Sequence, residues 1–344
     1  MNQPPQIVDM TDLPDLPLDD AMLHDYGITL DELRVWHTLL PKPVERRIAA
    51  YKSKQRFVHY TTAAAAVEIA RSRSIWLRNT TCMNDFSEVH FGMKRVIEFF
   101  GGDAGKPFWS LLDELVPNSS MHVKSTYDGW ASDLRYNTYV ACVSEHDESE
   151  DKTGRLSMWR AYGPQTGVGI VINGAAFHSS SDALGAFSYP VEYAGAADCD
   201  RMFQELVDRA VASKSVFGAL APENLHGFVF EMLSYFSLAL KHPGFSEERE
   251  WRVVHRPNFN PNHHLKPKVV VLSGLPQRVY PLPLKDFAGD GIRGVPLNEL
   301  VDRVLVGPTQ FPVAASEAII HELSEAEVVD ARKRVFVTDI PLRT

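Results

Sequence analysis

Hydrophobic positions along the chain fall into short runs of β-branched and aromatic residues bounded by turn residues, a pattern typical of β-strands. The strongest runs lie at residues 139–144 and 167–173. Further runs predict strands at 57–60, 75–77, 251–255, 269–272, 304–306 and 335–338. The chain is therefore expected to contain a sheet assembled from segments spread over its whole length.

Longer stretches with helical spacing of apolar residues lie between these runs. Thr29 and Glu32 form a capping-box pattern that predicts the start of a helix, and Pro41 and Pro43 interrupt the run that follows. Helices are also predicted at 61–71, with Thr61 or Thr62 as its cap, at 86–100 and at 157–162, where Gly163 and Pro164 end it. Residues 201–241 read as two long amphipathic helices broken near Pro222.

Helices and strands are intermingled and do not strictly alternate, which favours an α+β fold with a mixed sheet. We expect an N-terminal arm and helical extension over residues 1–50, and a single α+β domain over 51–344 with a helical insertion at about 201–241. The first twenty or so residues are rich in Pro and Asp and predict a loosely ordered arm.

The charge, the cysteine content and the apolar stretches of the chain argue against several classes of protein. The formal net charge of −9 argues against broad electrostatic binding to nucleic acid. Three cysteines without a close pair provide no disulfide framework, which favours a reducing cytoplasm. No basic stretch leads into an apolar run at the N-terminus, so no signal peptide is expected. The most apolar stretch, 228–240, contains Glu231 and is too short to span a bilayer, so no membrane association is expected.

Three distant segments combine aromatic and polar residues, as functional sites often do. The first contains His59, Tyr60 and Thr61, the second Trp159 and Tyr162, and the third Glu248, Glu250 and Arg252. Each also has a structural interpretation. His59 fits a core-edge histidine, Trp159 and Tyr162 fit core packing from one helix face, and Glu250 with Arg252 fits an ion pair on a solvated surface.

Other candidates have simpler explanations. Asp85 precedes a predicted helix and Glu88 lies three residues later, a pattern typical of helix capping. The acidic stretch 144–152 has no spacing typical of a metal-binding loop and is interpreted as a solvated turn. No cysteine–histidine spacing indicates zinc, so no metal is expected.

Taken together, these segments resemble a bacterial family of proteins, the domain-of-unknown-function family 2971. The resemblance rests on His59-Tyr60-Thr61, on residues 75–77 and 83–88, on residues 158–162 and on residues 248–252, in this order. It covers roughly residues 55 to 310 and implies no particular activity.

A more distant resemblance is to the ADP-ribosyltransferase superfamily, whose first motif often reads His-Gly-Ser or His-Gly-Thr. Here His59 and Thr61 flank Tyr60 in place of the glycine, Tyr162 lies on a helix between two strands, and Glu250 begins a late strand. The resemblance implies an ADP-ribosyltransferase-like mixed sheet core and NAD as substrate. His59, Tyr60, Thr61, Trp159, Tyr162 and Arg252 would bind NAD, and Glu250 and Glu248 would be catalytic.

If the chain follows the chemistry of that superfamily, as the resemblance implies, His59 would bind a ribose hydroxyl of NAD. Tyr162 would stack on the nicotinamide ring, together with Trp159 or Tyr60. Glu250 would stabilise positive charge as nicotinamide leaves, and Glu248 would orient the acceptor. The expected function is therefore an NAD-dependent ADP-ribosyltransferase acting on an unidentified protein or nucleic-acid acceptor, as in a toxin or phage-defence effector. The alternatives are a non-enzymatic module that binds a nucleotide or peptide, an NAD glycohydrolase and, ranked lowest, a nuclease-like toxin.

Overall fold

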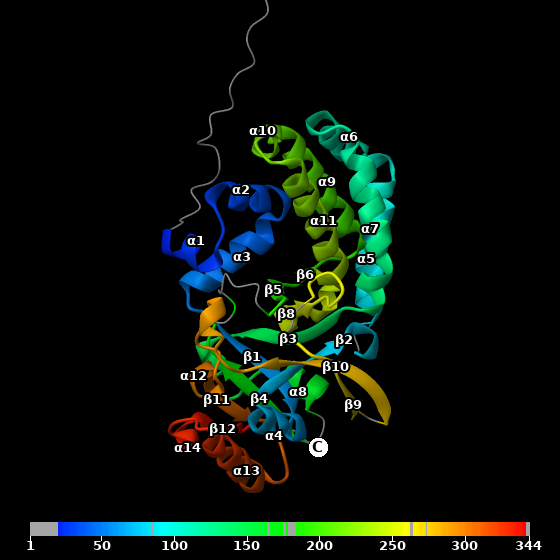
Figure 1. The fold of residues 1–344 in the computed structure, drawn as a ribbon. Coiled ribbons are helices and arrows are strands. Elements are labelled where there is room, and N and C mark those ends of the chain that lie inside the picture. The colour runs from blue at the N-terminus through cyan, green and yellow to red at the C-terminus, as the bar shows by residue number, and fades with distance from the viewer. Residues whose placement is uncertain are drawn as a thin grey trace, which may run out of the picture.

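A computed structural model of the chain describes residues 20–83, 86–163, 166–174, 177, 184–261, 264–272 and 274–341. Its described part is α+β with a mixed, mostly antiparallel sheet, as the sequence pattern predicted (Figure 1). The predicted N-terminal arm and the proposed cap Asp85 lie outside the described residues.

Ten strands form the large sheet in the described part of the chain. Eight follow one another in the order β12 (Val335–Val337), β11 (Val301–Val306), β4 (Gly167–Ile172), β1 (Arg56–Thr62), β3 (Tyr139–His146), β2 (Ser74–Asn79), β10 (Leu275–Pro283) and β9 (Lys268–Leu272). Strand β8 (Glu250–His255) pairs with β3 and with β5 (Ala186–Pro190). Strands β6 (Glu192–Tyr193) and β7 (Leu240–Lys241) form a small parallel pair.

Strand β3 is the branch point of the sheet. One edge pairs with β8 along its length, from Tyr139 opposite His255 to Ser144 opposite Glu250. The other edge pairs with β1 only from Ser144 onward and with β2 only at Tyr139 and Val140. The sheet therefore forks along β3 at residues 141–143, where neither β1 nor β2 continues the ladder.

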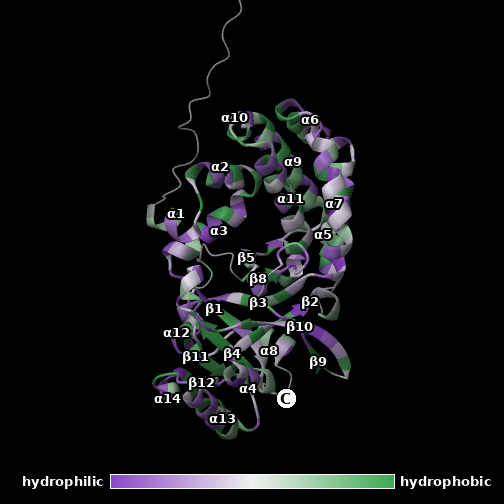
Figure 2. Ribbon diagram, in the orientation of Figure 1, coloured by the Kyte–Doolittle hydropathy of each residue, from purple (hydrophilic) through white to green (hydrophobic). Residues whose placement is uncertain are grey.

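Helices cover both faces of this sheet (Figure 1). On one face, six helices pack into a large apolar cluster: α5 (Phe86–Gly101), α6 (Lys106–Leu115), α7 (Ser119–Tyr136), α9 (Ala196–Ala212), α10 (Lys214–Gly218) and α11 (Pro222–Ala239). Near the opposite end lie α4 (Ala63–Ser72), α12 (Leu297–Leu300), α13 (Pro312–Glu325) and α14 (Ala331–Arg334). Figure 2 shows hydrophobic residues concentrated on β4 and β11, the strands between these layers.

The N-terminal helices are α1 (Asp20–Tyr26), α2 (Leu30–Leu39) and α3 (Pro41–Lys52). Thr29 and Glu32 form the predicted capping box at the start of α2. Pro41 separates α2 from α3 and occupies the first position of α3, where its fixed φ suits a helix and its missing N–H costs nothing. The short α8 (Leu156–Tyr162) ends at Gly163, as predicted.

All eight predicted strands are present, and the helical block begins at Ala196, slightly before the predicted 201. The sequence pattern did not predict α6, α7, α13 or β10. In α7 the signal was present, because Val123, Tyr127 and Leu134 lie on one buried stripe among many polar residues. In the described part of the chain, no helix combines the length and the apolar character needed to cross a bilayer.

Candidate ligand-binding cavity

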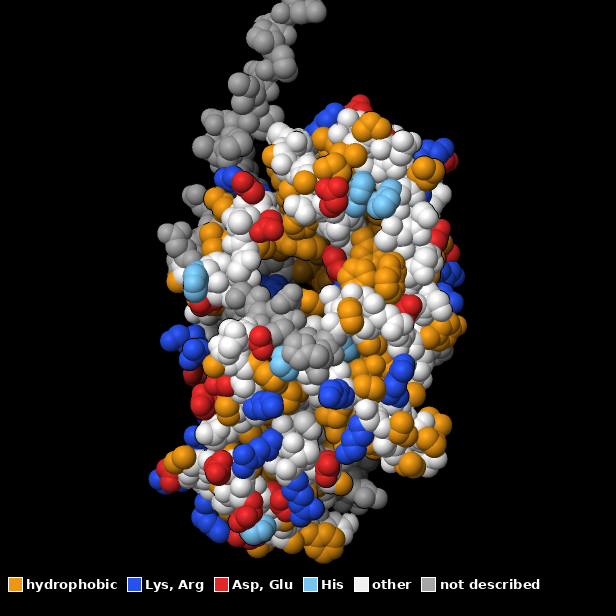
Figure 3. Space-filling model, in the orientation of Figure 1, with side chains coloured by type: hydrophobic (Ala, Val, Ile, Leu, Met, Phe, Trp, Pro, Cys, Tyr) orange, Lys and Arg blue, Asp and Glu red, His pale blue; other side chains and the backbone are white. Residues whose placement is uncertain are grey.

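A cavity of about 600 Å³ lies beside β5, between the N-terminal helices, α11 and the sheet. Figure 3 shows the corresponding hollow, with hydrophobic side chains on its walls, between α2–α3 and α11. Its walls come from segments far apart in the sequence, including Met22, His59, Tyr189, Glu231 and Leu300. The cavity is thus a product of the tertiary fold.

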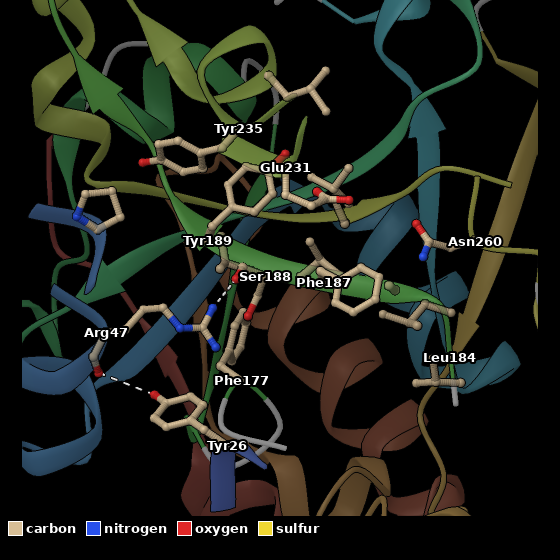
Figure 4. A pocket seen from close by; sticks show the side chains of 18 of the residues that line it. Tyr26, Arg47, Phe177, Leu184, Phe187, Ser188, Tyr189, Glu231, Tyr235 and Asn260 are labelled. Atoms are coloured by element: carbon tan, nitrogen blue, oxygen red, sulfur yellow. Dashed lines mark hydrogen bonds between the residues drawn. The ribbon is translucent and has the colours of Figure 1, made fainter. Parts of the chain in front are cut away.

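The cavity extends around an edge of the sheet. It is lined by Ser188 and Tyr189 on β5 and by Val253 and Val254 on β8. Consecutive strand residues point to opposite faces, so the cavity reaches both faces of this strand pair. This is possible because β5 pairs only with β8 in the described chain. In Figure 4, Tyr189 and Tyr235 lie on one side of Ser188 and the ring of Phe177 on the other.

The part of the cavity between α1–α3 and α11, here called the helix-lined part, carries the charged groups. Arg256 donates to the Glu231 carboxylate at 2.7 Å. Arg47 donates to the Ser188 carbonyl, and the Tyr26 hydroxyl donates to the Arg47 carbonyl at 3.4 Å. Arg256 therefore has a carboxylate partner, whereas Arg47 is held by a neutral backbone carbonyl.

Two hydroxyl groups near this part are buried without a hydrogen-bond partner in the described structure: Tyr189 Oη and Ser234 Oγ. Burial raises the pKa of Tyr189 well above its usual range, although Arg256 and Arg252 oppose the shift, so the phenol is neutral. An unpaired buried hydroxyl costs free energy, typically about 1–3 kcal/mol. Both unpaired hydroxyl groups are therefore expected to lower the free energy of unfolding.

The rest of the cavity, here called the sheet-lined part, is bounded by β1, β2, β3, β4, β5, β8, β10 and the segment from Leu284 to Leu300. Its described walls are apolar except for His59 and Ser188, and they include Ile75, Val143, Phe177, Val253 and Leu282. His59 Nδ1 lies 2.9 Å from the Cys142 carbonyl oxygen. Burial lowers the pKa of His59, so the imidazole is neutral near pH 7.

Tyr60 lies on the opposite face of β1 from His59. Its hydroxyl accepts a hydrogen bond from the Arg155 backbone N–H at 2.9 Å, and its ring packs edge-to-face on Trp159. Burial raises the pKa of Tyr60 to about 12. Thr61 is half-buried on the same strand. His59 and Tyr60 are adjacent in the sequence motif, but their side chains point to opposite faces of β1, because consecutive strand residues alternate in direction.

Trp159 is 2% exposed and its indole N–H donates to the Thr153 carbonyl at 2.8 Å. The ring is surrounded by glycines: a Cβ added at Gly154 or Gly307 would come within 2.6 or 2.8 Å of it. Tyr162 packs against the same small apolar cluster. In this structure Trp159 is a core residue, which agrees with the packing interpretation of the pattern.

Glu248, Glu250 and Arg252 belong to a buried ion cluster. Glu250 accepts from Arg252 Nε at 2.7 Å and from Lys241 Nζ at 2.8 Å, and Lys241 also lies 2.8 Å from Glu248. Arg252 also pairs with Glu88. Burial alone would raise the pKa of Glu250, but Arg252 and Lys241 lower it to about 2. The predicted Glu250–Arg252 pair is confirmed, but the surface position was wrong, because Glu250 is 3% and Arg252 2% exposed.

The acidic stretch between residues 144 and 152 is held by arginines. Glu145 pairs with Arg46 at 2.7 Å and Asp151 with Arg56 at 2.9 Å. Arg249 contacts both Glu145 and Asp147. The stretch is thus a set of ion pairs between elements, more ordered than a solvated turn.

The eight predicted site residues therefore lie in separate places. His59 lines the cavity, whereas Tyr60, Trp159 and Tyr162 form a core cluster on the other face of β1. Of the described residues that line the cavity, none belongs to the ion cluster of Glu88, Lys241, Glu248, Glu250 and Arg252. Sequence patterns did not identify Tyr189 or Arg256 as cavity residues. Glu231, a lone charge in an apolar helical stretch, was the available signal.

Comparison with protein families gives a match to part of the chain. Residues 158–253 match the family described as Protein of unknown function (DUF2971), a narrower range than the 55–310 expected from the motifs. The matched segment runs from α8 to β8 and includes Trp159, Tyr162, Glu250 and Arg252, but not His59. No curated protein and no solved structure matches the chain.

Proposed function

We propose that this protein binds a small, largely apolar molecule in the cavity beside β5. The observation that supports this proposal is the cavity itself, about 600 Å³ with mostly apolar walls drawn from both faces of the sheet edge. Small-molecule sites in proteins have volumes of about 300–1,000 Å³, with apolar walls and a few polar groups that orient the ligand. This is the binding-module alternative, with an apolar ligand in place of a nucleotide or peptide.

The charges of the cavity favour this ligand class over a nucleotide. Arg256 is paired with Glu231, and Arg47 donates to the Ser188 carbonyl. A phosphate group would have to compete with these partners. An apolar molecule, in contrast, gains free energy from each part of its surface that leaves water.

A fluorescence titration with 1-aminoanthracene, a neutral apolar probe, tests the proposal. Wild type is expected to bind the probe saturably with one site. Ala186→Phe and Val253→Phe place a ring at two lining positions and should weaken binding at least tenfold. Ala64→Phe adds the same ring at an exposed position of α4 and should leave binding unchanged. Absence of saturable binding to wild type, or equal binding by folded Ala186→Phe and Val253→Phe, would overturn the proposal.

The NAD-dependent ADP-ribosyltransferase is a second proposal, and NAD glycohydrolase activity is its variant without an acceptor. It is supported by His59, the first-motif residue, which lines the cavity. It requires Glu250 to leave Lys241 and Arg252 in order to reach NAD. Release of nicotinamide from NAD by wild type, lost in folded His59→Ala, tests it, and label transfer to protein or nucleic acid separates transferase from glycohydrolase.

A further inference from the structure

His59 occupies the fork of the sheet. β1 leaves β3 after Val58, which pairs with Ser144, and β2 pairs with β3 at Tyr139 and Val140. The β3 edge at residues 141–143 is therefore free of a neighbouring strand in the described chain. The His59 imidazole reaches this edge and contacts the Cys142 carbonyl at 2.9 Å. At the fork, the Cys142 carbonyl is thus contacted by the His59 side chain in place of the backbone of a neighbouring strand.

This contact fixes the tautomer of His59. A carbonyl oxygen only accepts hydrogen bonds, so Nδ1 must carry the hydrogen and Nε2 must present its lone pair. Nε2 makes no hydrogen bond with a described residue, and it is not among the fully enclosed unpaired atoms such as Ser234 Oγ. Since His59 lines the cavity, its free acceptor is available to a ligand.

The surroundings of Nε2 define what such a ligand needs. The described lining residues on β1, β2, β3, β4, β8 and β10 include no Lys, Arg, Asp or Glu, and Arg47 contacts this part at the Ser188 carbonyl. An acceptor in apolar surroundings loses its hydrogen bonds to water and gains from a donor that replaces them. An ionised carboxylate or phosphate has no donor hydrogen for Nε2, and the lining residues of the surrounding strands offer it no cation. The lowered pKa of His59 agrees with a neutral acceptor.

We infer that His59 Nε2 accepts a hydrogen bond from the ligand, and that the ligand is a neutral apolar molecule with a hydroxyl or N–H group. This inference rests on the proposed function and specifies its ligand class. The apolar body fills the sheet-lined part, and the donor group is directed to the fork by His59 Nε2. His59 is thus a specificity-determining residue, because it favours a ligand with a hydrogen-bond donor over the same ligand whose donor hydrogen is replaced by a methyl group.

A matched pair of probes tests the inference. Isothermal titration calorimetry compares 2-naphthol with 2-methoxynaphthalene, in which a methyl group replaces the donor hydrogen. Wild type should bind 2-naphthol about 3- to 10-fold more tightly, the usual net effect of one hydrogen bond. In His59→Phe, which keeps a flat ring, the ratio of the two Kd values should fall to about 1. His59→Gln restores an acceptor oxygen and should recover part of the preference.

Because both probes are measured on the same variant, a change in cavity shape that affects both alike cancels in the ratio of their Kd values. Ser188→Ala removes the other polar side chain of the described sheet-lined walls, a hydroxyl, and should leave the ratio unchanged. A preference that persists in His59→Phe, or equal binding of the two probes by wild type, overturns the inference while the binding proposal stands. Failure of both probes and of 1-aminoanthracene to bind overturns the proposed function itself.

Discussion

Glu250 and Lys241 form an ion pair of 2.8 Å in which the side chains are only 4% and 1% exposed. The pair joins β8 to β7, the strand that directly follows α11. Charges buried this deeply need close partners, since each has lost its hydration. Arg252 provides the second partner of Glu250 at 2.7 Å. The cluster therefore has a structural role in joining β8 to β7 and to Glu88.

Glu250→Gln should destabilise the protein by about 3–5 kcal/mol, the usual effect of removing one partner from a buried ion pair. Lys241 and Arg252 would then have one carboxylate fewer, with Glu88 and Glu248 still beside them. Urea unfolding followed by circular dichroism measures the change. Glu317→Gln removes a surface partner of Arg332 and should leave the midpoint unchanged. Equal midpoints for Glu250→Gln and wild type would contradict the structural role.

The same substitution affects how an enzymatic test is interpreted. Loss of NAD chemistry in Glu250→Gln follows equally from a lost catalytic group and from an unfolded protein. His59→Ala separates these cases better, because His59 lies outside the ion cluster and lines the cavity. The free energy of unfolding must therefore be measured beside activity for each variant.

Stability should fall in acid partly through Glu250. Its pKa is about 2 in the folded protein against an ordinary value of 4.5, so the stabilisation is present above pH 4.5 and is lost as pH falls toward 2. Urea unfolding between pH 3 and pH 7 measures this slope. Glu145 and Asp302 also have lowered pKa values, and they contribute to the pH dependence of stability in wild type and in Glu250→Gln alike. The difference between wild type and Glu250→Gln should therefore narrow below pH 4.5, and a constant difference would contradict the assignment.

Gly307→Ala should destabilise the protein by about 1–3 kcal/mol, because its Cβ would lie 2.8 Å from the enclosed Trp159 ring. Gly129→Ala is the matched control. It lies in the exposed middle of α7 with no atom within 4 Å of the added Cβ, and should stabilise by about 0.5–1 kcal/mol. Thermal unfolding measures both, and a tolerated Gly307→Ala would show that the Trp159 pocket has spare room.

Ser234→Ala and Ser237→Ala, on the same helix, should have opposite effects. Ser234 Oγ is buried without a partner in the described structure, so its removal should leave stability unchanged or raise it. Ser237 Oγ donates to the Leu233 carbonyl at 2.7 Å and contacts the Tyr127 hydroxyl at 2.6 Å. Its removal should cost about 1–3 kcal/mol. Unfolding midpoints that fall equally for both would contradict this assignment.

Local sequence patterns predicted much of the fold. The capping box of Thr29 and Glu32, the glycine after Tyr162 and the apolar runs of β3 and β4 each act within a few residues, so they can be recognised without the tertiary structure. Helix α7 was missed because its buried stripe is sparse among polar residues. The α+β class followed from the intermingled order of these elements.

The site followed less directly from the sequence. His59 was identified as a candidate, and the pairing of Glu250 with Arg252 was predicted from their shared strand face. Their surroundings were not predictable, because Lys241 and Glu88 come from other elements and Cys142 meets His59 only at the fork of β3. The motif residues follow the expected order along the chain, but the structure places them in the cavity wall, a core cluster and a buried ion cluster.

The sequence by itself determined eight of the strands, several helices, the absence of a disulfide framework and the residues able to carry chemistry, since these depend on residue type and short-range spacing. The tertiary structure decided which face of β1 holds His59, which carboxylates are buried with cations, and where the cavity lies. The physical reason is that burial and dielectric surroundings arise from long-range packing. The same glutamate is a solvated surface charge or a buried ion-pair partner according to the elements that cover it.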